Sequence, residues 1–248
     1  NSREGLRFNH VSEYLGSHIF TLLGIETQET FLGTYKGENV VVIQDFLEED
    51  EVFVPFNGVG DSSLEQDKEK YQYSYEDIIT MLQENVKLTD VEQTVNLFWD
   101  MFVIDAFIAN FDRHGSNWGF IKKNNRYRLS PVFDNGSSLF PQLNTDEKIE
   151  TVLRNQEEID RRIYKFPTSQ VKYKGKKSSY YEIISSLAFE ECNHALVRIV
   201  ERTDFDKINK LIESVENISE QRKKFYKIIL QQRYEKILLK SYHELMAK

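Results

Sequence analysis

The sequence predicts an α+β fold with two lobes, a small β-containing lobe first and a larger helical lobe after it. Residues 29–46 hold two stretches of alternating apolar residues around a short polar turn, which is typical of a β-hairpin. Residues 90–110 are apolar around almost the whole circumference of a helix, which indicates a buried central helix. Residues 219–245 repeat apolar residues at helical spacing. We place the lobes at residues 1–73 and 74–248.

Composition limits the classes of protein that the chain can belong to. Its 248 residues, 40% of them hydrophobic, are enough for one large domain or two modest lobes around a shared cleft. The formal net charge of −8 argues against a direct nucleic-acid binder, which needs a basic face. Cys192 is the single cysteine, so an internal disulfide and a cysteine-based zinc site are excluded. No apolar run reaches the length of a membrane span.

The first lobe is expected to contain one helix and the first hairpin. Residues 11–23 repeat apolar side chains at helical spacing, and Gly24 follows as a helix stop. Lys36-Gly37-Glu38 provides the turn of the hairpin. Residues 47–73 are acidic and then rich in Gly, Asn and Ser, which is the composition of a mobile loop between the lobes.

The second lobe is expected to be mainly helical. It begins with a helix opened by a capping pattern at Ser74, and Asp90 opens the buried helix, which ends near Asn110. A second short hairpin follows at residues 118–132. Helices then alternate with a basic loop at residues 172–177 before the long C-terminal helix.

Three polar residues lie where the buried helix gives way to the second hairpin. Asp112 and Asn117 are five residues apart on the loop after the helix, and Asp134 follows seventeen residues later, beyond the hairpin. Paired strands lie about 5 Å apart, so the two ends of a hairpin are neighbours. We therefore expect Asn117 and Asp134 to lie together, with Asp112 beside them.

This arrangement has the parts that phosphoryl transfer requires. One carboxylate can orient an attacking hydroxyl and accept its proton, while an amide oxygen and a second carboxylate can hold Mg²⁺. The order Asp, Asn, hairpin, Asp-x-Gly is that of protein-kinase active sites, and the last element here is Asp134-Asn135-Gly136, with Asn135 in place of the usual Phe. Ordinary turn residues are the plain alternative. A hydrolase with Asp112, His114 and Asp134 as metal ligands is another.

The sequence resembles a known family in a set of matching segments. The resemblance is to the HipA-like serine/threonine kinases, which include bacterial toxin kinases and the cell-translocating kinases of the CtkA type, and it covers essentially the whole chain. It implies a two-lobed protein-kinase-like fold with ATP and Mg²⁺ in the cleft. By position it implies that Asp112 is the catalytic residue, that Asn117 and Asp134 hold the metal, and that His114 contacts the nucleotide. The segments are Glu29-Thr30-Phe31-Leu32-Gly33-Thr34-Tyr35, Phe98-Trp99-Asp100-Met101 through Asn117-Trp118-Gly119-Phe120, Leu129-Ser130-Pro131-Val132-Phe133-Asp134, and Phe166-Pro167-Thr168-Ser169.

The resemblance also implies nucleotide-binding positions in the first lobe. It makes Gln44-Asp45-Phe46 the hinge whose backbone binds adenine, with Gln44 and Phe46 as candidate binding residues; a plain interlobe linker is the alternative. Glu13, on the first helix, matches the Glu that pairs with a phosphate-binding Lys, and a solvent-exposed helix glutamate is the other interpretation. His114 could instead be a structural histidine, and Arg113 is expected to pair with a nearby carboxylate.

One part of the kinase pattern does not occur in this sequence. Neither a Gly-rich loop nor a strand Lys precedes the first helix, and both would lie upstream of Asn1. We therefore expect the chain to be a piece of a longer protein; the alternative is a copy that has lost its phosphate clamp.

The leading functional hypothesis is an ATP- and Mg²⁺-dependent protein kinase acting on Ser or Thr hydroxyls. Ser62 and Ser63 are candidate autophosphorylation sites in the loop between the lobes. A degraded kinase that serves as a binding module, or a small-molecule kinase, is the alternative. An antitoxin-like partner protein is expected from the resemblance alone. We expect neither a nucleic-acid nor a membrane partner, and a bacterial cytoplasmic location, with export into host cells as the alternative.

Overall fold

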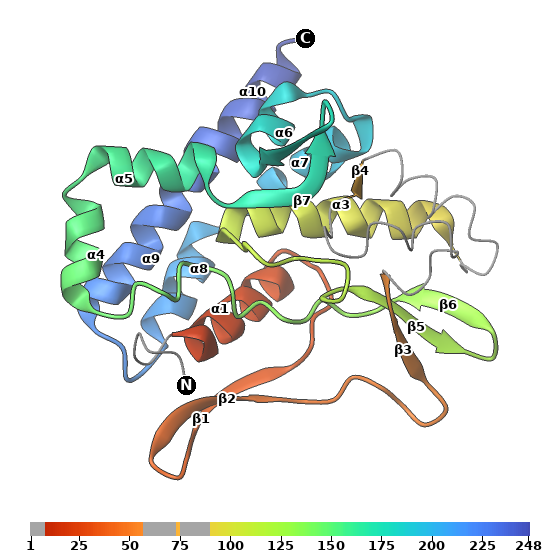
Figure 1. Cartoon of the computed structure of the whole chain (residues 1–248), viewed down its shortest axis with the longest axis horizontal. Coiled ribbons are helices and arrows are strands. Elements are labelled where there is room, and N and C mark those ends of the chain that lie inside the picture. The colour runs from red at the N-terminus through yellow and green to blue at the C-terminus, as the bar shows by residue number, and fades with distance from the viewer. Residues whose placement is uncertain (1–7, 57–72, 75–89) are drawn as a thin grey trace.

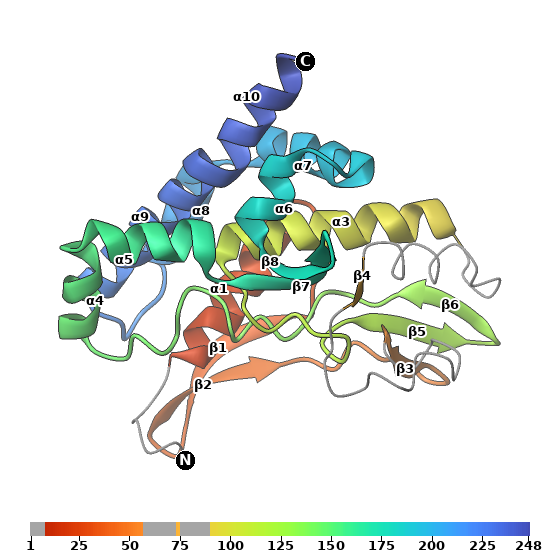
Figure 2. The same cartoon turned by 45° about the horizontal axis from the view of Figure 1, so that its top comes forward.

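The structure is a computed structural model that describes residues 8–56, 73–74 and 90–248. A long helix, α3 (Val91–Ile108), crosses the molecule, with α6 (Tyr180–Ser186) and α7 (Glu190–Arg202) on one side of it and α1 (Asn9–Leu22) on the other (Figures 1 and 2). The hairpin formed by β1 (Thr30–Tyr35) and β2 (Glu38–Ile43) lies beyond α1, farthest from the C-terminus in Figure 1. The α+β fold class predicted from the sequence is confirmed.

The N-terminal helix and hairpin form close to where the sequence predicts them. Helix α1 ends before Gly24, whose φ of +81° is a left-handed conformation that glycine adopts without steric cost. Strands β1 (Thr30–Tyr35) and β2 (Glu38–Ile43) pair antiparallel around the predicted turn. Between helix and hairpin, Gln28 donates its backbone N–H to the carbonyl of Val132, so this segment contacts the stretch that precedes Asp134.

The central helix α3 explains why its sequence is apolar on nearly every side. It begins at Asp90, whose carboxylate accepts the backbone N–H of Gln93 as a helix cap. Its residues from Phe98 onward are buried, including Asp100 and Asp105. The helix ends at Ala109, which has a left-handed backbone (φ +57°) and turns the chain into the next loop.

A three-stranded sheet contains the second predicted hairpin and a strand that the sequence did not predict. Strands β5 (Gly119–Lys123) and β6 (Arg126–Leu129) pair as expected, and β3 (Val52–Pro55) pairs with the other edge of β5. Predicting residues 47–73 as a mobile loop was therefore wrong for β3. The residue after β3, Phe56, is buried and stacks on Trp118 with ring centroids 4.0 Å apart.

One predicted loop is a hairpin in the structure, and other predictions concern residues outside the described ranges. The basic stretch at residues 172–177 is not a loop, because it forms a hairpin of β7 (Thr168–Tyr173) and β8 (Lys176–Ser179), with β4 (Tyr73–Ser74) paired parallel to β7. The helix predicted after Ser74, and the candidate phosphorylation sites Ser62 and Ser63, lie outside the described residues.

The remaining helices build the C-terminal part of the core. The predicted long C-terminal helix is present as α9 followed without a break by a π-helical segment and α10. Among the residues that the structure describes, no helix combines the length and apolarity that a membrane crossing needs. The elements are α4 (Asp146–Leu153), α5 (Gln156–Asp160), η3 (Arg161–Lys165), α6 (Tyr180–Ser186), α7 (Glu190–Arg202), α8 (Phe205–Glu213), α9 (Glu220–Arg233), η4 (Tyr234–Leu239) and α10 (Lys240–Met246).

Candidate active site

The loop that carries Asp112 is fixed from the end of α3. Asn110 is fully buried, and its amide nitrogen donates to the Asp105 carboxylate at 3.0 Å. The Asn110 side-chain oxygen accepts the backbone N–H of Asp112 at 3.1 Å. A buried amide thus orients the backbone of Asp112, while the Asp112 side chain remains half exposed.

Arg113 holds the two ends of the hairpin together. Its guanidinium pairs with the buried Asp105 carboxylate through Nε at 2.8 Å and Nη2 at 3.0 Å. Its Nη1 donates to the backbone carbonyls of both Asn117, at 2.9 Å, and Phe133, at 2.5 Å. Burial alone would lower the pKa of Arg113, but the charge and hydrogen bonds of Asp105 outweigh it, so the pKa is raised and the cation is favoured. The predicted carboxylate partner of Arg113 is therefore Asp105.

The predicted neighbours Asp112, His114 and Asn117 share one tight loop. The Asn117 amide nitrogen donates to the backbone carbonyl of Asp112 at 2.8 Å. This hydrogen bond does not use the side-chain oxygen of Asn117. The backbone N–H of Ser116 donates to Nδ1 of His114 at 3.2 Å. In the neutral ring the proton is therefore on Nε2, which lies 3.8 Å from the Asp112 carboxylate. His114 is thus part of the loop that presents Asp112.

Asp134 follows directly from the strand end that Arg113 holds. It has a left-handed backbone, with φ of +56°, and its residue is exposed. A non-glycine residue in this region is uncommon and is often found at functional sites. Since Arg113 binds the carbonyls of Asn117 and Phe133 with one nitrogen, the backbones that bear Asn117 and Asp134 lie side by side, as the sequence predicted.

Glu13 reaches the same place from α1. It is 5% exposed, so the interpretation of Glu13 as a solvent-exposed helix residue is wrong. Burial raises the pKa of the Glu13 carboxyl, and the negative charge of Asp134 raises it further. Arg113, the backbone N–H of Asn135 and the hydroxyl of Ser17 act in the opposite direction. Two carboxylates therefore interact here, and a cation would relieve their repulsion.

The predicted hinge residues differ in how much of their backbone is available. The N–H of Gln44 already donates to the carbonyl of Glu29 at 3.0 Å, and its carbonyl accepts from the side chain of Gln28 at 2.9 Å. Within the described residues, no hydrogen bond reaches the backbone of Phe46. Of the two candidates, Phe46 is therefore the one whose backbone could meet a ligand.

An aromatic patch adjoins the hinge and Asp134, and the sequence did not predict it. The rings of Phe46, Phe53 and Phe133 contact one another, with centroids 5.2 to 6.2 Å apart, and all three are partly exposed. Phe53 belongs to β3, in the segment expected to be a loop. The missed signal was the short apolar run at residues 52–56, which is rich in Val and Phe. The patch could cover one face of a flat ligand ring.

The donor set fits Mg²⁺ with a nucleotide better than a protein-only metal site. The described part of the chain contains no group of three or more His, Cys, Asp or Glu residues placed to hold a metal ion. Mg²⁺ in nucleotide sites usually takes one or two carboxylates and completes its shell with phosphates and water. Asp134 and the side-chain oxygen of Asn117 supply such a set.

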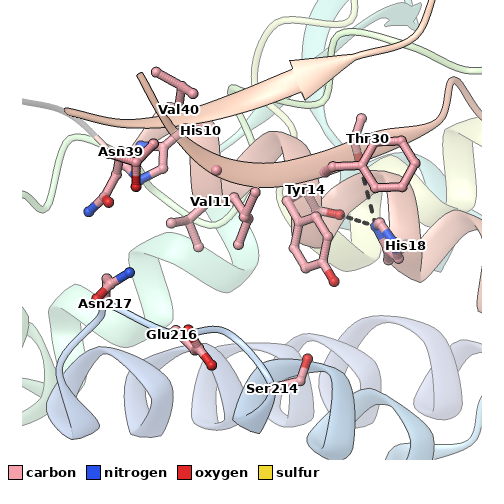
Figure 3. Close-up of a pocket in the computed structure, with 14 residues that line it drawn as sticks. His10, Val11, Tyr14, His18, Thr30, Asn39, Val40, Ser214, Glu216 and Asn217 are labelled. Atoms are coloured by element: carbon pink, nitrogen blue, oxygen red, sulfur yellow. Dashed lines mark hydrogen bonds between the residues drawn. The ribbon is translucent and has the colours of Figure 1, made fainter. Parts of the chain in front are cut away.

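A separate cavity lies on the neighbouring face of α1. It measures about 600 Å³ and lies between α1, the β1–β2 hairpin and the connection from α8 to α9. Figure 3 shows Tyr14 and His18 of α1 side by side in it, with Glu216 and Asn217 across from them. None of the predicted site residues lines this cavity. The kinase-like residues therefore form a different site.

Comparisons with known proteins agree with this geometry. The sequence matches the HipA-like C-terminal domain family over residues 3–221. It is 37% identical over 230 residues to the serine/threonine-protein kinase CtkA of Helicobacter pylori, an alignment that covers 92% of this chain and 70% of that protein.

Solved structures show the same relationship. The crystal structure of a Helicobacter pylori proinflammatory kinase CtkA superposes with a TM-score of 0.90 and 34% identity, covering 97% of this chain and 85% of that one. A chain from the Shewanella oneidensis MR-1 toxin–antitoxin complex of HipA, HipB and operator DNA gives a TM-score of 0.61 at 12% identity, over 94% of this chain and 57% of that one, which indicates a shared fold. The chain belongs to the HipA-like serine/threonine kinase family.

Proposed function

We propose that this kinase transfers the γ-phosphoryl group of ATP to a Ser or Thr hydroxyl of a protein, with Mg²⁺ bound at Asn117 and Asp134. One observation carries the proposal: a single nitrogen of Arg113 binds the backbones of Asn117 and Phe133, so the two metal-binding candidates lie side by side next to the loop of Asp112. Phosphoryl transfer depends mainly on such positioning and on charge stabilisation.

Each residue of the site has a distinct role in this proposal. The half-exposed Asp112 carboxylate orients the acceptor hydroxyl and takes its proton. Asn117 and Asp134 provide oxygen ligands, and the bound Mg²⁺ offsets charge on the phosphate oxygens. His114, with its Nε2 beside Asp112, contacts the nucleotide or keeps the Asp112 loop in place.

The nucleotide would lie between the unit of residues 1–73 and that of residues 74–248. The aromatic patch of Phe46, Phe53 and Phe133 would hold the adenine ring, with the backbone of Phe46 at its edge. We assign Glu13 the role of partner to a phosphate-binding lysine, because its buried carboxylate beside Asp134 favours a nearby cation.

The partners and the location follow from the relatives as proposals. The kinase would act on a protein substrate, and an antitoxin-like protein is a candidate regulator, since the HipA chain of similar fold is in a complex with HipB. A bacterial cytoplasmic location, or translocation into host cells, is part of the same proposal. Autophosphorylation at Ser62 or Ser63 would be one further activity.

The proposal is tested by phosphate transfer from γ-labelled ATP in the full-length protein, with myelin basic protein as acceptor and phosphoamino-acid analysis of the product. Asp112→Ala should abolish labelling of Ser and Thr, because the variant lacks the carboxylate that takes the proton of the acceptor hydroxyl. Asp206→Ala, which removes an exposed carboxylate from α8, should leave labelling unchanged. Undiminished transfer by Asp112→Ala would refute the role of Asp112. ATP binding without any transfer by the wild type would favour the binding-module alternative.

A further inference from the structure

Asn135 stands where protein kinases usually have a Phe, and here it is completely buried. A buried amide has four hydrogen-bonding positions and is costly unless they are used. The Asn135 side-chain oxygen accepts from Nη2 of Arg113 at 2.6 Å, and its nitrogen donates to the hydroxyl of Ser17 at 3.0 Å. The residue therefore joins the Asp112 loop to α1.

The hydrogen bonds continue in one direction from a cation to a carboxylate. Arg113 donates to Asn135, Asn135 donates to Ser17, and the Ser17 hydroxyl lies 3.3 Å from Oε1 of Glu13, to which it donates. The Glu13 carboxylate also accepts the backbone N–H of Asn135. Because the guanidinium can only donate and the carboxylate can only accept, the two ends set the orientation of the amide between them. We name Arg113, Asn135, Ser17 and Glu13 the amide relay.

Helix α1 packs against Asn135 so closely that the contact requires glycine on the helix. A Cβ placed on Gly16 would lie 2.7 Å from Cβ of Asn135. Two turns earlier, the Asn9 side chain donates to the backbone carbonyl of Gly136 at 2.7 Å. The helix thus meets the Asp134-Asn135-Gly136 segment along its length, not only through the relay.

The segment after Gly136 also makes hydrogen bonds with α3, with the residue before α1 and with α9. Leu139 donates its N–H to the carbonyl of Ile108 at the end of α3, and Phe8, just before α1, donates to the carbonyl of Pro141. Arg222 of α9 stacks on the ring of Phe8 at 3.5 Å from its centroid and donates to the carbonyl of Leu143. The position of α1 and the segment after Asp134 are therefore held by the same contacts.

We propose that Asn135 is a positioning residue that replaces the aromatic packing of other kinases with a hydrogen-bonded relay, which sets the Glu13 carboxylate beside Asp134. This inference rests on the proposed phosphoryl transfer. In this inference, Asn135 and Ser17 orient the Glu13 carboxylate and do not contact the substrate themselves. It also makes the arrangement of α1 independent of an aromatic side chain at position 135.

A purely structural role is the competing explanation, since a satisfied buried amide also stabilises a core. The two explanations differ in what a small change at Ser17 does. If the relay acts through Glu13, removal of the Ser17 hydroxyl changes nucleotide turnover even where the fold stays intact. If it is only part of the core, the change lowers stability and leaves turnover per folded molecule the same.

The test uses the full-length kinase with four changes: Ser17→Ala, Asn135→Leu, Glu13→Gln and the combination of Ser17→Ala with Glu13→Gln. Ser12→Ala is the matched control, because Ser12 is also a fully buried serine of α1, yet its hydroxyl has no hydrogen-bond partner among the residues that the structure describes. Kcat and KM for ATP are measured with Mg²⁺ saturating, and Tm is recorded for each variant.

Ser17→Ala should lower kcat/KM for ATP by about tenfold, the usual scale for a lost hydrogen bond to a charged group. Ser12→Ala should stay within about twofold of the wild type. In the Glu13→Gln background, Ser17→Ala should cause little further loss, because both changes remove the same interaction. Asn135→Leu should lower kcat/KM at least as much; if it does not fold, the Ser17 comparison still decides.

Two results would overturn the inference. One is a Ser17→Ala enzyme that matches Ser12→Ala in kcat/KM. The other is a double variant whose fold loss in kcat/KM equals the product of the losses in Ser17→Ala and Glu13→Gln, because the two changes would then act independently. Either result can occur while Asp112→Ala abolishes transfer, so failure of the relay is distinguishable from failure of the proposed function.

Discussion

Replacing Arg113 with Met should destabilise the protein and abolish its activity by separable routes. Arg113 is 7% exposed and its partner Asp105 is 0% exposed, and two guanidinium nitrogens contact the two carboxylate oxygens. Met keeps much of the side-chain volume but leaves the Asp105 charge buried, with Asn110 as its remaining side-chain hydrogen-bond donor among the described residues. Breaking a buried pair from one side costs about 3–5 kcal/mol.

The size of this effect can be measured by urea unfolding followed by circular dichroism. A loss of about 3–5 kcal/mol corresponds to a Tm lower by roughly 6–20 °C for a chain of this size. Adding Asp105→Asn removes the unpaired charge, so the double variant should regain about 1–3 kcal/mol. Phosphate transfer should not return, because the carbonyls of Asn117 and Phe133 still lack the donor that holds them together.

Three results would contradict this role of Arg113. An Arg113→Met variant within about 1 kcal/mol of the wild type would mean that the pair contributes no more than an exposed one. A double variant no more stable than Arg113→Met would mean that the loss does not come from the unpaired Asp105 charge. Full activity in the double variant would refute the role of Arg113 in holding the site.

Three further predictions follow from other parts of the molecule. Gly119→Ala places a Cβ 2.4 Å from the backbone oxygen of Val54, so it should lower the free energy of urea unfolding by about 1–3 kcal/mol. Gly33→Ala is the control, because the nearest atom to its added Cβ is 4.0 Å away. Equal losses in the two variants would contradict the predicted clash. Hydrogen bonds from Arg162 and Arg161 lower the pKa of Glu158 from 4.5 to about 2, so the ionised Glu158 stabilises the folded protein above pH 4.5 and this contribution is lost as the pH falls toward 2. Glu158→Gln should therefore be less stable than the wild type by under about 1 kcal/mol at pH 6 and equally stable at pH 2. A stability difference that does not change with pH would refute this. Burial raises the pKa of Cys192, so iodoacetamide at pH 8 should modify it in urea and not in the folded protein; rapid labelling of the folded chain would contradict its burial.

The sequence was informative where periodicity and spacing carry the structure. Helix α3 was recognisable because a helix buried on all sides has few polar positions, and Asp90 has the type of side chain that caps it. The proximity of Asn117 and Asp134 followed from the hairpin alone, since the ends of paired strands are close wherever the hairpin lies. These features depend on local rules.

The features that the sequence did not predict depend on tertiary contacts. Strand β3 is an apolar run of four residues, too short to show a periodicity, and it forms because the edge of β5 is available to it. The partner of Arg113 could not be chosen between several carboxylates before the end of α3 was placed beside the loop. Likewise, Asn135 was visible as a departure from the kinase pattern, but its partner Ser17 is 118 residues away.

We propose that Asp112 acts in the chemistry while Asp134 holds the metal of one shared nucleotide site. Calorimetric titration of the full-length protein with a non-hydrolysable ATP analogue, with and without Mg²⁺, separates these roles for Asp112→Ala and Asp134→Ala. Asp112→Ala should bind the analogue with Mg²⁺ as the wild type does, whereas Asp134→Ala should lose the part of the affinity that depends on Mg²⁺. Mg²⁺-dependent binding that survives in Asp134→Ala would contradict the assignment of the site.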